Sequence, residues 1–176
     1  MNVPALPPIV IRLFQEPDAA AVRDLFVTIN RQLAPPGGRD AFEAYIERSL
    51  TEEMGRIAAY YPEHDGGFWV AVREGAVVGM FGLERAAPDA MELRRMYVDP
   101  SVRRGGIARA MLDRAEAESR RFGARRLELS TSELQQAALE LYRRSGYRLV
   151  REEVAEAASN KTVGGGIQRF YFEKAI

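Results

Sequence analysis

The residues from Glu92 to Leu112, ELRRMYVDPSVRRGGIARAML, contain the pattern best suited to binding a charged ligand. They read as a strand, a stop at Pro100, the basic glycine turn Arg103–Gly106 and then a helix. The first turn of a helix exposes unpaired backbone N–H groups at the positive end of its dipole. Glycines let a phosphate approach those groups, and arginines add charge-assisted hydrogen bonds. The turn therefore suits a pyrophosphate, although a purely structural connection between strand and helix would show the same spacing.

The strand before this turn has an irregular apolar pattern. Leu93, Met96 and Val98 are all candidates for the core, but Leu93 and Met96 are three residues apart. Strict alternation would place these two side chains on opposite faces of a sheet. An extra residue at Arg94-Arg95, forming a β-bulge, brings all three to one face. A bulge also leaves backbone groups without ladder partners, so that a ligand can use them. A short strand with poor alternation is the alternative.

A second stretch with chemical potential is Leu134–Tyr147, LQQAALELYRRSGY. Its apolar residues recur at helical spacing and predict a core-facing stripe of Leu134, Ala137, Ala138 and Leu141, which Tyr142 extends. The stretch alone favours Tyr142 as a core aromatic whose hydroxyl reaches the rim of the core.

Taken together, these segments resemble the GNAT N-acetyltransferase superfamily. Arg103-x-x-Gly106-x-Ala108 matches its pyrophosphate-binding signature, Arg/Gln-x-x-Gly-x-Gly/Ala, and Leu93–Pro100 matches the strand that commonly precedes it. A second motif, Ala-x-x-Leu-Tyr-x-x-x-Gly-Phe/Tyr, is matched by the sequence that runs from Ala138 to Tyr147. All three occur in the family's order and spacing.

The resemblance implies that acetyl-CoA is the co-substrate and that no metal is needed. Backbone amides from Arg104 to Ala108 would hold the pyrophosphate, and the main chains of Met96 and Val98 would pair with the pantetheine arm. The implied cofactor-binding residues are Met96, Tyr97, Val98, Arg103, Arg104, Gly105, Gly106, Ile107, Ala108 and Gln135. Two positions depart from the family pattern. Arg104-Gly105 replaces the commoner order of Gly before a variable residue, and Gln135 stands where asparagine is frequent.

The resemblance also implies two catalytic residues. Glu92 would take the proton of the acceptor amine, directly or through water, and Tyr142 would protonate the departing CoA thiolate. A lysine-like amine has a pKa of about 10.4, so it needs a base before it can attack a thioester. The tetrahedral oxyanion would need a donor such as the Met96 amide. The structural alternative for Glu92 is a surface ion pair with Arg94.

The elements that position these residues form a mixed α/β pattern. Strands are expected at Ile9–Phe14, Phe68–Arg73, Ala76–Glu84, Met91–Val98, Arg126–Ser130, Tyr147–Arg151 and Ile167–Lys174. Helices are expected from Asp18 to about Leu33, about Arg39 to Ala59, Gly106–Phe122 and Leu134–Ser145. The order βααβββαβαββ predicts a GNAT-like, mostly antiparallel central sheet flanked by helices, with a bulge in the fourth strand, in one domain spanning residues 1–176.

Composition excludes several other kinds of protein. Apolar residues make up 47% and charged residues 28%, with zero formal net charge, so no global field attracts nucleic acid or an anionic membrane. There is no cysteine and only one histidine, His64, which excludes thiol chemistry and multi-histidine metal sites. The N-terminal MNVPALPPIV does not resemble a secretory signal, and no apolar run is long enough for a bilayer, so a cytoplasmic location is expected.

We therefore expect an N-acetyltransferase in which an amine attacks acetyl-CoA directly within a ternary complex. The alternative is a non-catalytic acyl-CoA-binding sensor or structural module. The acceptor, a small-molecule or protein amine, is not encoded by a motif. The segments expected to shape its pocket are Gln32–Tyr61 and Glu152–Gly166, and a homodimer is possible.

Overall fold

The computed structural model describes residues 5–176, and the first four residues of the N-terminal segment considered above lie outside it. Seven strands form one sheet in the order β1-β2-β3-β4-β5-β7-β6. The strands are β1 Val10–Leu13, β2 Gly67–Arg73, β3 Ala76–Ala87, β4 Ala90–Val98, β5 Arg126–Ser132, β6 Arg148–Ala155 and β7 Ile167–Ala175. Only β4 and β5 pair in parallel, and every other neighbouring pair is antiparallel.

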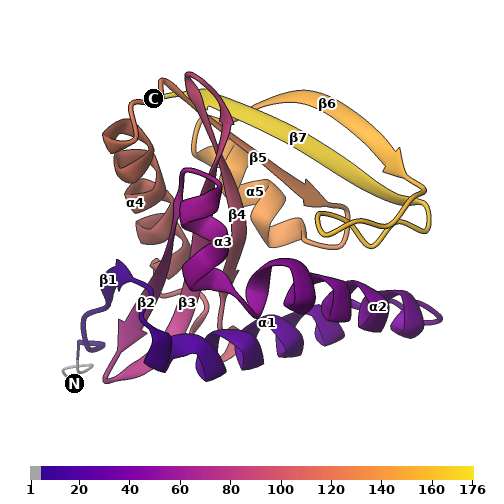
Figure 1. Cartoon of the computed structure of the whole chain (residues 1–176), viewed down its shortest axis with the longest axis horizontal. Helices are drawn as coiled ribbons and strands as arrows, with labels where there is room; N and C mark the ends of the chain where they lie inside the picture. The colour runs from indigo at the N-terminus through magenta and orange to yellow at the C-terminus, as the bar shows by residue number, and fades with distance from the viewer. Residues whose placement is uncertain (1–4) are drawn as a thin grey trace.

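Helices cover both faces of this sheet (Figure 1). They are α1 Ala19–Leu33, α2 Arg39–Ser49, α3 Ile57–Glu63, α4 Ile107–Arg121 and α5 Gln136–Arg144. One buried cluster joins α4 and α5 to the sheet around Trp69, Phe81 and Met111. The other joins α1, α2 and α3 to the opposite face around Phe26, Val70 and Met80. Among the described residues, no helix is both long and apolar enough to cross a membrane.

The predicted fold class is confirmed, and local turn conformations explain where two of its elements end. The β2–β3 hairpin turns at Glu74-Gly75, where both residues have positive φ, as a two-residue hairpin turn requires. Gly123 ends α4 in the left-handed conformation, which glycine adopts without steric cost.

Two details of the predicted helices are wrong. The single helix expected from Arg39 to Ala59 is α2, a π-helical turn at Leu50–Met54 and the separate helix α3. The π-helical turn buries the Glu53 side chain completely, although glutamate is a residue type that is mostly exposed in folded proteins. In α5 the fully buried residues are Leu139 and Tyr142, whereas Ala137 is exposed.

Candidate acetyl-CoA and acceptor site

The sheet opens between β4 and β5. These strands pair only from Ala90 to Leu93 on β4 and from Arg126 to Leu129 on β5. Beyond Leu93, β4 continues against β3 while β5 continues against β7, and the two halves of the sheet diverge in Figure 1. The β4 edge from residue 94 to residue 98 therefore faces an opening instead of another strand, and its backbone can pair with an extended ligand.

The predicted bulge lies at this point of divergence. The β3–β4 register shifts between Met80, opposite Tyr97, and Gly82, opposite Arg94, and this inserts one extra residue in β4. Arg95 takes up the extra residue with φ of 54°. Leu93, Met96 and Val98 consequently pack against the same core cluster, so the bulge predicted from their spacing is confirmed.

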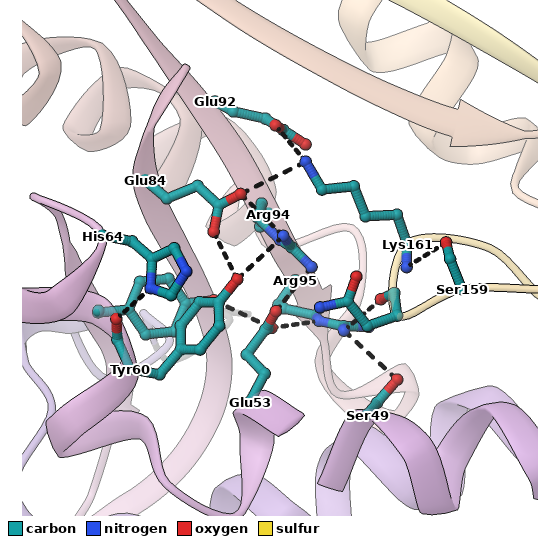
Figure 2. A network of polar contacts seen from close by, with 12 residues as sticks. Ser49, Glu53, Tyr60, His64, Glu84, Glu92, Arg94, Arg95, Ser159 and Lys161 are labelled. Carbon is teal, nitrogen blue, oxygen red and sulfur yellow. Dashed lines mark hydrogen bonds and ion pairs between the residues drawn. The ribbon is translucent and has the colours of Figure 1, made fainter. Parts of the chain in front are cut away.

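The bulge also sends two consecutive arginines toward one carboxylate (Figure 2). Glu53 Oε1 lies 2.6 Å from Arg94 Nη2, and its Oε2 lies 2.5 Å from Arg95 Nε. All three side chains are at most 5% exposed. Consecutive residues of a regular strand point to opposite faces, so this arrangement requires the bulge. We call Glu53, Arg94 and Arg95 the arginine anchor.

Further contacts tie the anchor to its surroundings. Arg94 Nη1 donates to Glu84 Oε1 at 2.8 Å, and the Tyr60 hydroxyl donates to Glu84 Oε2 at 2.8 Å. Burial tends to raise the pKa of Glu84, but the Arg94 charge and these hydrogen bonds outweigh burial and lower it. Burial, the main cause, raises the pKa of Tyr60 well above 10. Glu84 is therefore held as a carboxylate and Tyr60 as a neutral donor.

The predicted phosphate turn is exposed and conformationally special. Arg104 and Gly106 have φ of 70° and 74°, on either side of Gly105. The first bond of α4 runs from the Ala110 N–H to the Gly106 carbonyl, at 3.0 Å. Among residues 5–176, the N–H groups of residues 103–109 donate to no backbone carbonyl. We call residues 103–109 the phosphate loop. Left-handed residues on either side of Gly105, with N–H groups that donate to no backbone carbonyl, form a concavity suited to an anion.

The phosphate loop has room for a ligand and a cation that the sequence did not reveal. A Cβ placed on Gly106 would meet no atom within 4 Å. The Arg73 guanidinium, at the end of β2, lies 3.7 Å from the Cβ position of Gly105. Arg73 Nε is buried and has no hydrogen-bond partner within the described part of the chain, residues 5–176. The residues present therefore fit a phosphate group, and Arg73 adds a cation from a distant strand.

A pocket at the sheet opening brings together five of the predicted site residues: Glu92, Met96, Tyr97, Gln135 and Tyr142. The other predicted residues, Val98 and Arg103 to Ala108, lie outside its walls, further along β4 and in the phosphate loop. Gln135 accepts a hydrogen bond from the Thr131 hydroxyl at 3.0 Å through its carbonyl oxygen.

Glu92 has a different partner from the one that the structural alternative predicted. Its Oε2 lies 2.8 Å from Lys161 Nζ, whereas Arg94 pairs with Glu53 and Glu84. The interpretation of Glu92 as a partner of Arg94 is therefore wrong. Lys161 Nζ also lies 3.4 Å from Glu84 Oε1 (Figure 2).

Tyr142 is a buried phenol at the pocket wall. Its side chain is in the core cluster, 5% exposed, and it also lines the pocket. Burial, with a smaller effect of Tyr97, raises the pKa of its hydroxyl well above 10. Burial and then Tyr45 raise the pKa of Tyr97 to about 12. Both phenols therefore keep their protons at neutral pH.

The pocket also contains polar residues that no motif indicated: Tyr45, Asn160, Lys161 and Arg169. The first three fall within the segments expected to shape the acceptor pocket, Gln32–Tyr61 and Glu152–Gly166. The Asn160 carbonyl accepts from Arg95 Nη2 at 2.6 Å, so the loop between β6 and β7 is fastened to the bulge. Among residues 5–176, no three or more His, Cys, Asp and Glu side chains gather as metal ligands.

Comparisons with known proteins agree with this architecture. Residues 36–147 match the acetyltransferase (GNAT) family, and the chain belongs to that family. N-acetylaspartate synthetase from Danio rerio is 36% identical over 116 residues, which cover 65% of this chain and 41% of that protein. The uncharacterized N-acetyltransferase YjgM of Escherichia coli (strain K12) is 27% identical over 149 residues, covering 83% of this chain and 85% of YjgM.

A solved structure gives the same result for the fold. The PaiA N-acetyltransferase from Thermoplasma acidophilum, in complex with coenzyme A, has a TM-score of 0.72 at 19% identity. The alignment covers 96% of this chain and 99% of that one. The chain spans less than half the length of the N-acetylaspartate synthetases that it matches.

Proposed function

We propose that this protein transfers the acetyl group of acetyl-CoA to an amine. The observation that carries the proposal is the succession of three features from the start of α4 back along β4, which we propose as the cofactor path: the phosphate loop, the unpaired β4 edge and a pocket containing both Glu92 and Tyr142. Coenzyme A has an anionic pyrophosphate at one end and a thioester at the other. The path has free N–H groups at its first end and titratable side chains at its second.

In this proposal the phosphate loop binds the pyrophosphate through backbone N–H groups, with Arg103, Arg104 and Arg73 as cations. The pantetheine arm lies along Met96, Tyr97 and Val98 in the place of a missing strand. This pairing uses the same main-chain hydrogen bonds as strand addition at a sheet edge. Gln135 is a candidate contact for the arm from the opposite wall.

Glu92 and Tyr142 then divide the proton transfers. Glu92 takes a proton from the amine, which attacks the thioester carbonyl directly in a ternary complex. The backbone N–H of Met96, beside the bulge, is the proposed donor to the oxyanion. Tyr142 gives its proton to the CoA thiolate, and its raised pKa favours the protonated form that this role requires.

We also propose that the acceptor carries a carboxylate. Arg169 lines the pocket, and its guanidinium contacts Ser130 Oγ at 2.8 Å. Glu153, opposite Arg169 in the β6–β7 ladder, pairs with Arg151 instead. Among residues 5–176, Arg169 forms no ion pair with a carboxylate, and such a cation at a pocket wall favours an anionic substrate group. The names of the N-acetylaspartate synthetases support an amino-acid acceptor.

The first experiment measures release of free thiol from acetyl-CoA with a panel of amines. We expect turnover with at least one amine, and Glu92→Gln should lower it by about 10² to 10⁴, as loss of a general base does. Part of the loss should be recovered at high pH, where more of the amine is unprotonated. If the protein binds acetyl-CoA but releases no thiol with any amine of the panel, the result would instead support the non-catalytic sensor alternative.

Tyr142→Phe tests the second role, because it removes only the hydroxyl. Acetyl-CoA should still bind, and turnover should fall less with a thioester whose thiol has a lower pKa, since a better leaving group depends less on a proton. An equal deficit on both thioesters would leave Tyr142 as a packing residue.

Arg169→Gln tests the carboxylate. The variant should raise KM for amino acids, while amines that lack a carboxylate should be unaffected. Arg148→Gln is the matched control, since Arg148 is an exposed arginine that pairs with Glu173 outside the pocket. Equal effects of Arg169→Gln on both classes of amine would contradict this part of the proposal.

A further inference from the structure

A lysine of the chain itself is placed at the proposed acceptor position. Lys161 lies in the loop between β6 and β7, and its Nζ is 2.8 Å from Glu92 Oε2 and 3.4 Å from Glu84 Oε1. It lines the same pocket as Met96 and Tyr142. Figure 2 shows its side chain extending from the loop toward both carboxylates. An amine is therefore in contact with the proposed general base before any external acceptor binds.

The loop presents this lysine in a fixed manner. The Asn160 carbonyl is held by Arg95, and the Lys161 N–H donates to Ser159 Oγ at 3.1 Å. The Ser159 N–H donates to the Thr162 carbonyl at 2.9 Å, which closes a turn around Lys161. The side chain is still 48% exposed, so the flexible methylene chain has room to move between the carboxylates and the pocket. Anchoring on both sides of the residue raises the effective concentration of its amine in the pocket.

We propose that Lys161 is a site of self-acetylation. The Lys161 ammonium gives one proton to Glu92, which passes it to water, and Nζ then attacks the carbonyl carbon of acetyl-CoA. The C–N bond forms, the C–S bond breaks, and the thiolate takes a proton from Tyr142. The second proton lost from Nζ restores Tyr142. Lysine ammonium and acetyl-CoA thus give N-acetyllysine, CoA thiol and one proton.

Self-acetylation removes a charge from the pocket. The neutral amide cannot form the ion pairs that Lys161 now makes with Glu92 and Glu84, so the modification releases Glu92. An external amine needs the same base, so it competes with Lys161. This inference rests on the proposed function, because it requires acetyl transfer at the same site.

The chain contains its own control. Lys161 and Lys174 are its two lysines. Lys174 Nζ also lies 2.8 Å from a carboxylate, Glu116 Oε1, but Lys174 is on β7 and does not line the pocket. Each lysine therefore has its own carboxylate partner, and the two differ in their access to the proposed acetyl-CoA site.

The experiment incubates the purified full chain with deuterated acetyl-CoA, so that new label is distinguished from acetylation acquired during expression. Peptide mapping by mass spectrometry then gives the rate at each lysine. We expect label at Lys161 at least about 10² times faster than at Lys174, because Lys161 lines the pocket in which proximity to acetyl-CoA and proton removal would act together, and Lys174 does not. The rate should not depend on protein concentration, since the reaction is intramolecular. Lys161→Arg should abolish the label and Lys174→Arg should keep it.

Three results would overturn the inference alone. The first is thiol release with external amines but no label at Lys161, and the second is an equal rate at Lys161 and Lys174. The third is equal labelling of Lys161 in wild type and Glu92→Gln, since it would show uncatalysed chemistry. Absence of both thiol release and label, in a protein that binds acetyl-CoA, would overturn the proposed function together with the inference.

Discussion

The phosphate loop and the arginine anchor are both built around unusual backbone, but they hold it in opposite ways. The phosphate loop is a continuous segment, exposed from Arg103 to Gly106, whose N–H groups have no backbone acceptor among residues 5–176. The arginine anchor joins residues 42 positions apart and removes three charged side chains from water. Arg104 in the loop and Arg95 in the anchor nevertheless share the left-handed conformation.

The difference separates backbone donors that remain available to a ligand from contacts that stabilise the fold. A local contact precedes the loop, since the Ser101 N–H donates to Asp99 Oδ1 at 2.9 Å, while the N–H groups of the loop itself remain available to an anion. The anchor side chains contact one another and neighbouring residues of the fold, and these contacts hold the bulge in place. A substitution in the loop should therefore lower the affinity for acetyl-CoA, whereas a substitution in the anchor should lower the free energy of unfolding.

The largest effect is expected from Glu53→Ala in the anchor. The change leaves Arg95 as a buried charge without a carboxylate, and breaking a buried ion pair in this way costs about 3 to 5 kcal/mol. Chemical denaturation would measure the loss of unfolding free energy. The control is Glu63→Ala, which removes an exposed pair with Arg56 and should cost about 0 to 1 kcal/mol. Equal losses in the two variants would contradict the role of the anchor.

Gly106→Val tests the loop. The new side chain meets no protein atom within 4 Å but occupies the space of the phosphate, at a φ that valine adopts poorly. Loss of a hydrogen bond to a charged group costs about 1.5 to 3 kcal/mol, so acetyl-CoA affinity should fall by roughly 10- to 150-fold.

The control for this variant is Gly123→Val, at the other end of α4. Gly123 has φ of 80° and equally empty surroundings, so the strain is matched while the phosphate loop is untouched. Calorimetry should show unchanged acetyl-CoA affinity in that variant. The same loss of affinity in both would mean that strain at either end of α4, and not a phosphate site, explains the effect.

A smaller effect is expected from pH on the carboxylate beside the anchor. The folded state lowers the pKa of Glu84, so Glu84 contributes stability above its unfolded pKa of about 4.3, and this contribution is lost as pH falls through the folded value. The difference in unfolding free energy between wild type and Glu84→Gln should therefore shrink on acidification below about pH 4. A difference that stays constant with pH would show that Glu84 acts through shape alone.

The parts of the site that the sequence predicted are those that contiguous residues determine. The phosphate turn needs only a strand end, Pro100, two arginines and two glycines, followed by a helix. The bulge followed from the three-residue spacing of Leu93 and Met96, because a period of two cannot place both in one core. The inward position of Tyr142 followed from helical spacing, although Ala137 on the same predicted stripe is exposed.

The arginine anchor and the proposed acceptor side of the site depended on tertiary structure. No sequence pattern indicates that Glu53 is buried, and its burial is explained by the π-helical turn and the two bulge arginines. Lys161 meets Glu92 across 69 residues, and Arg169 reaches Ser130 across 39. Local sequence encodes backbone conformation through sterics and periodicity. It does not encode which distant charges meet. That pairing depends on the divergence of β4 from β5 and on the position of the β6–β7 loop beside the resulting pocket.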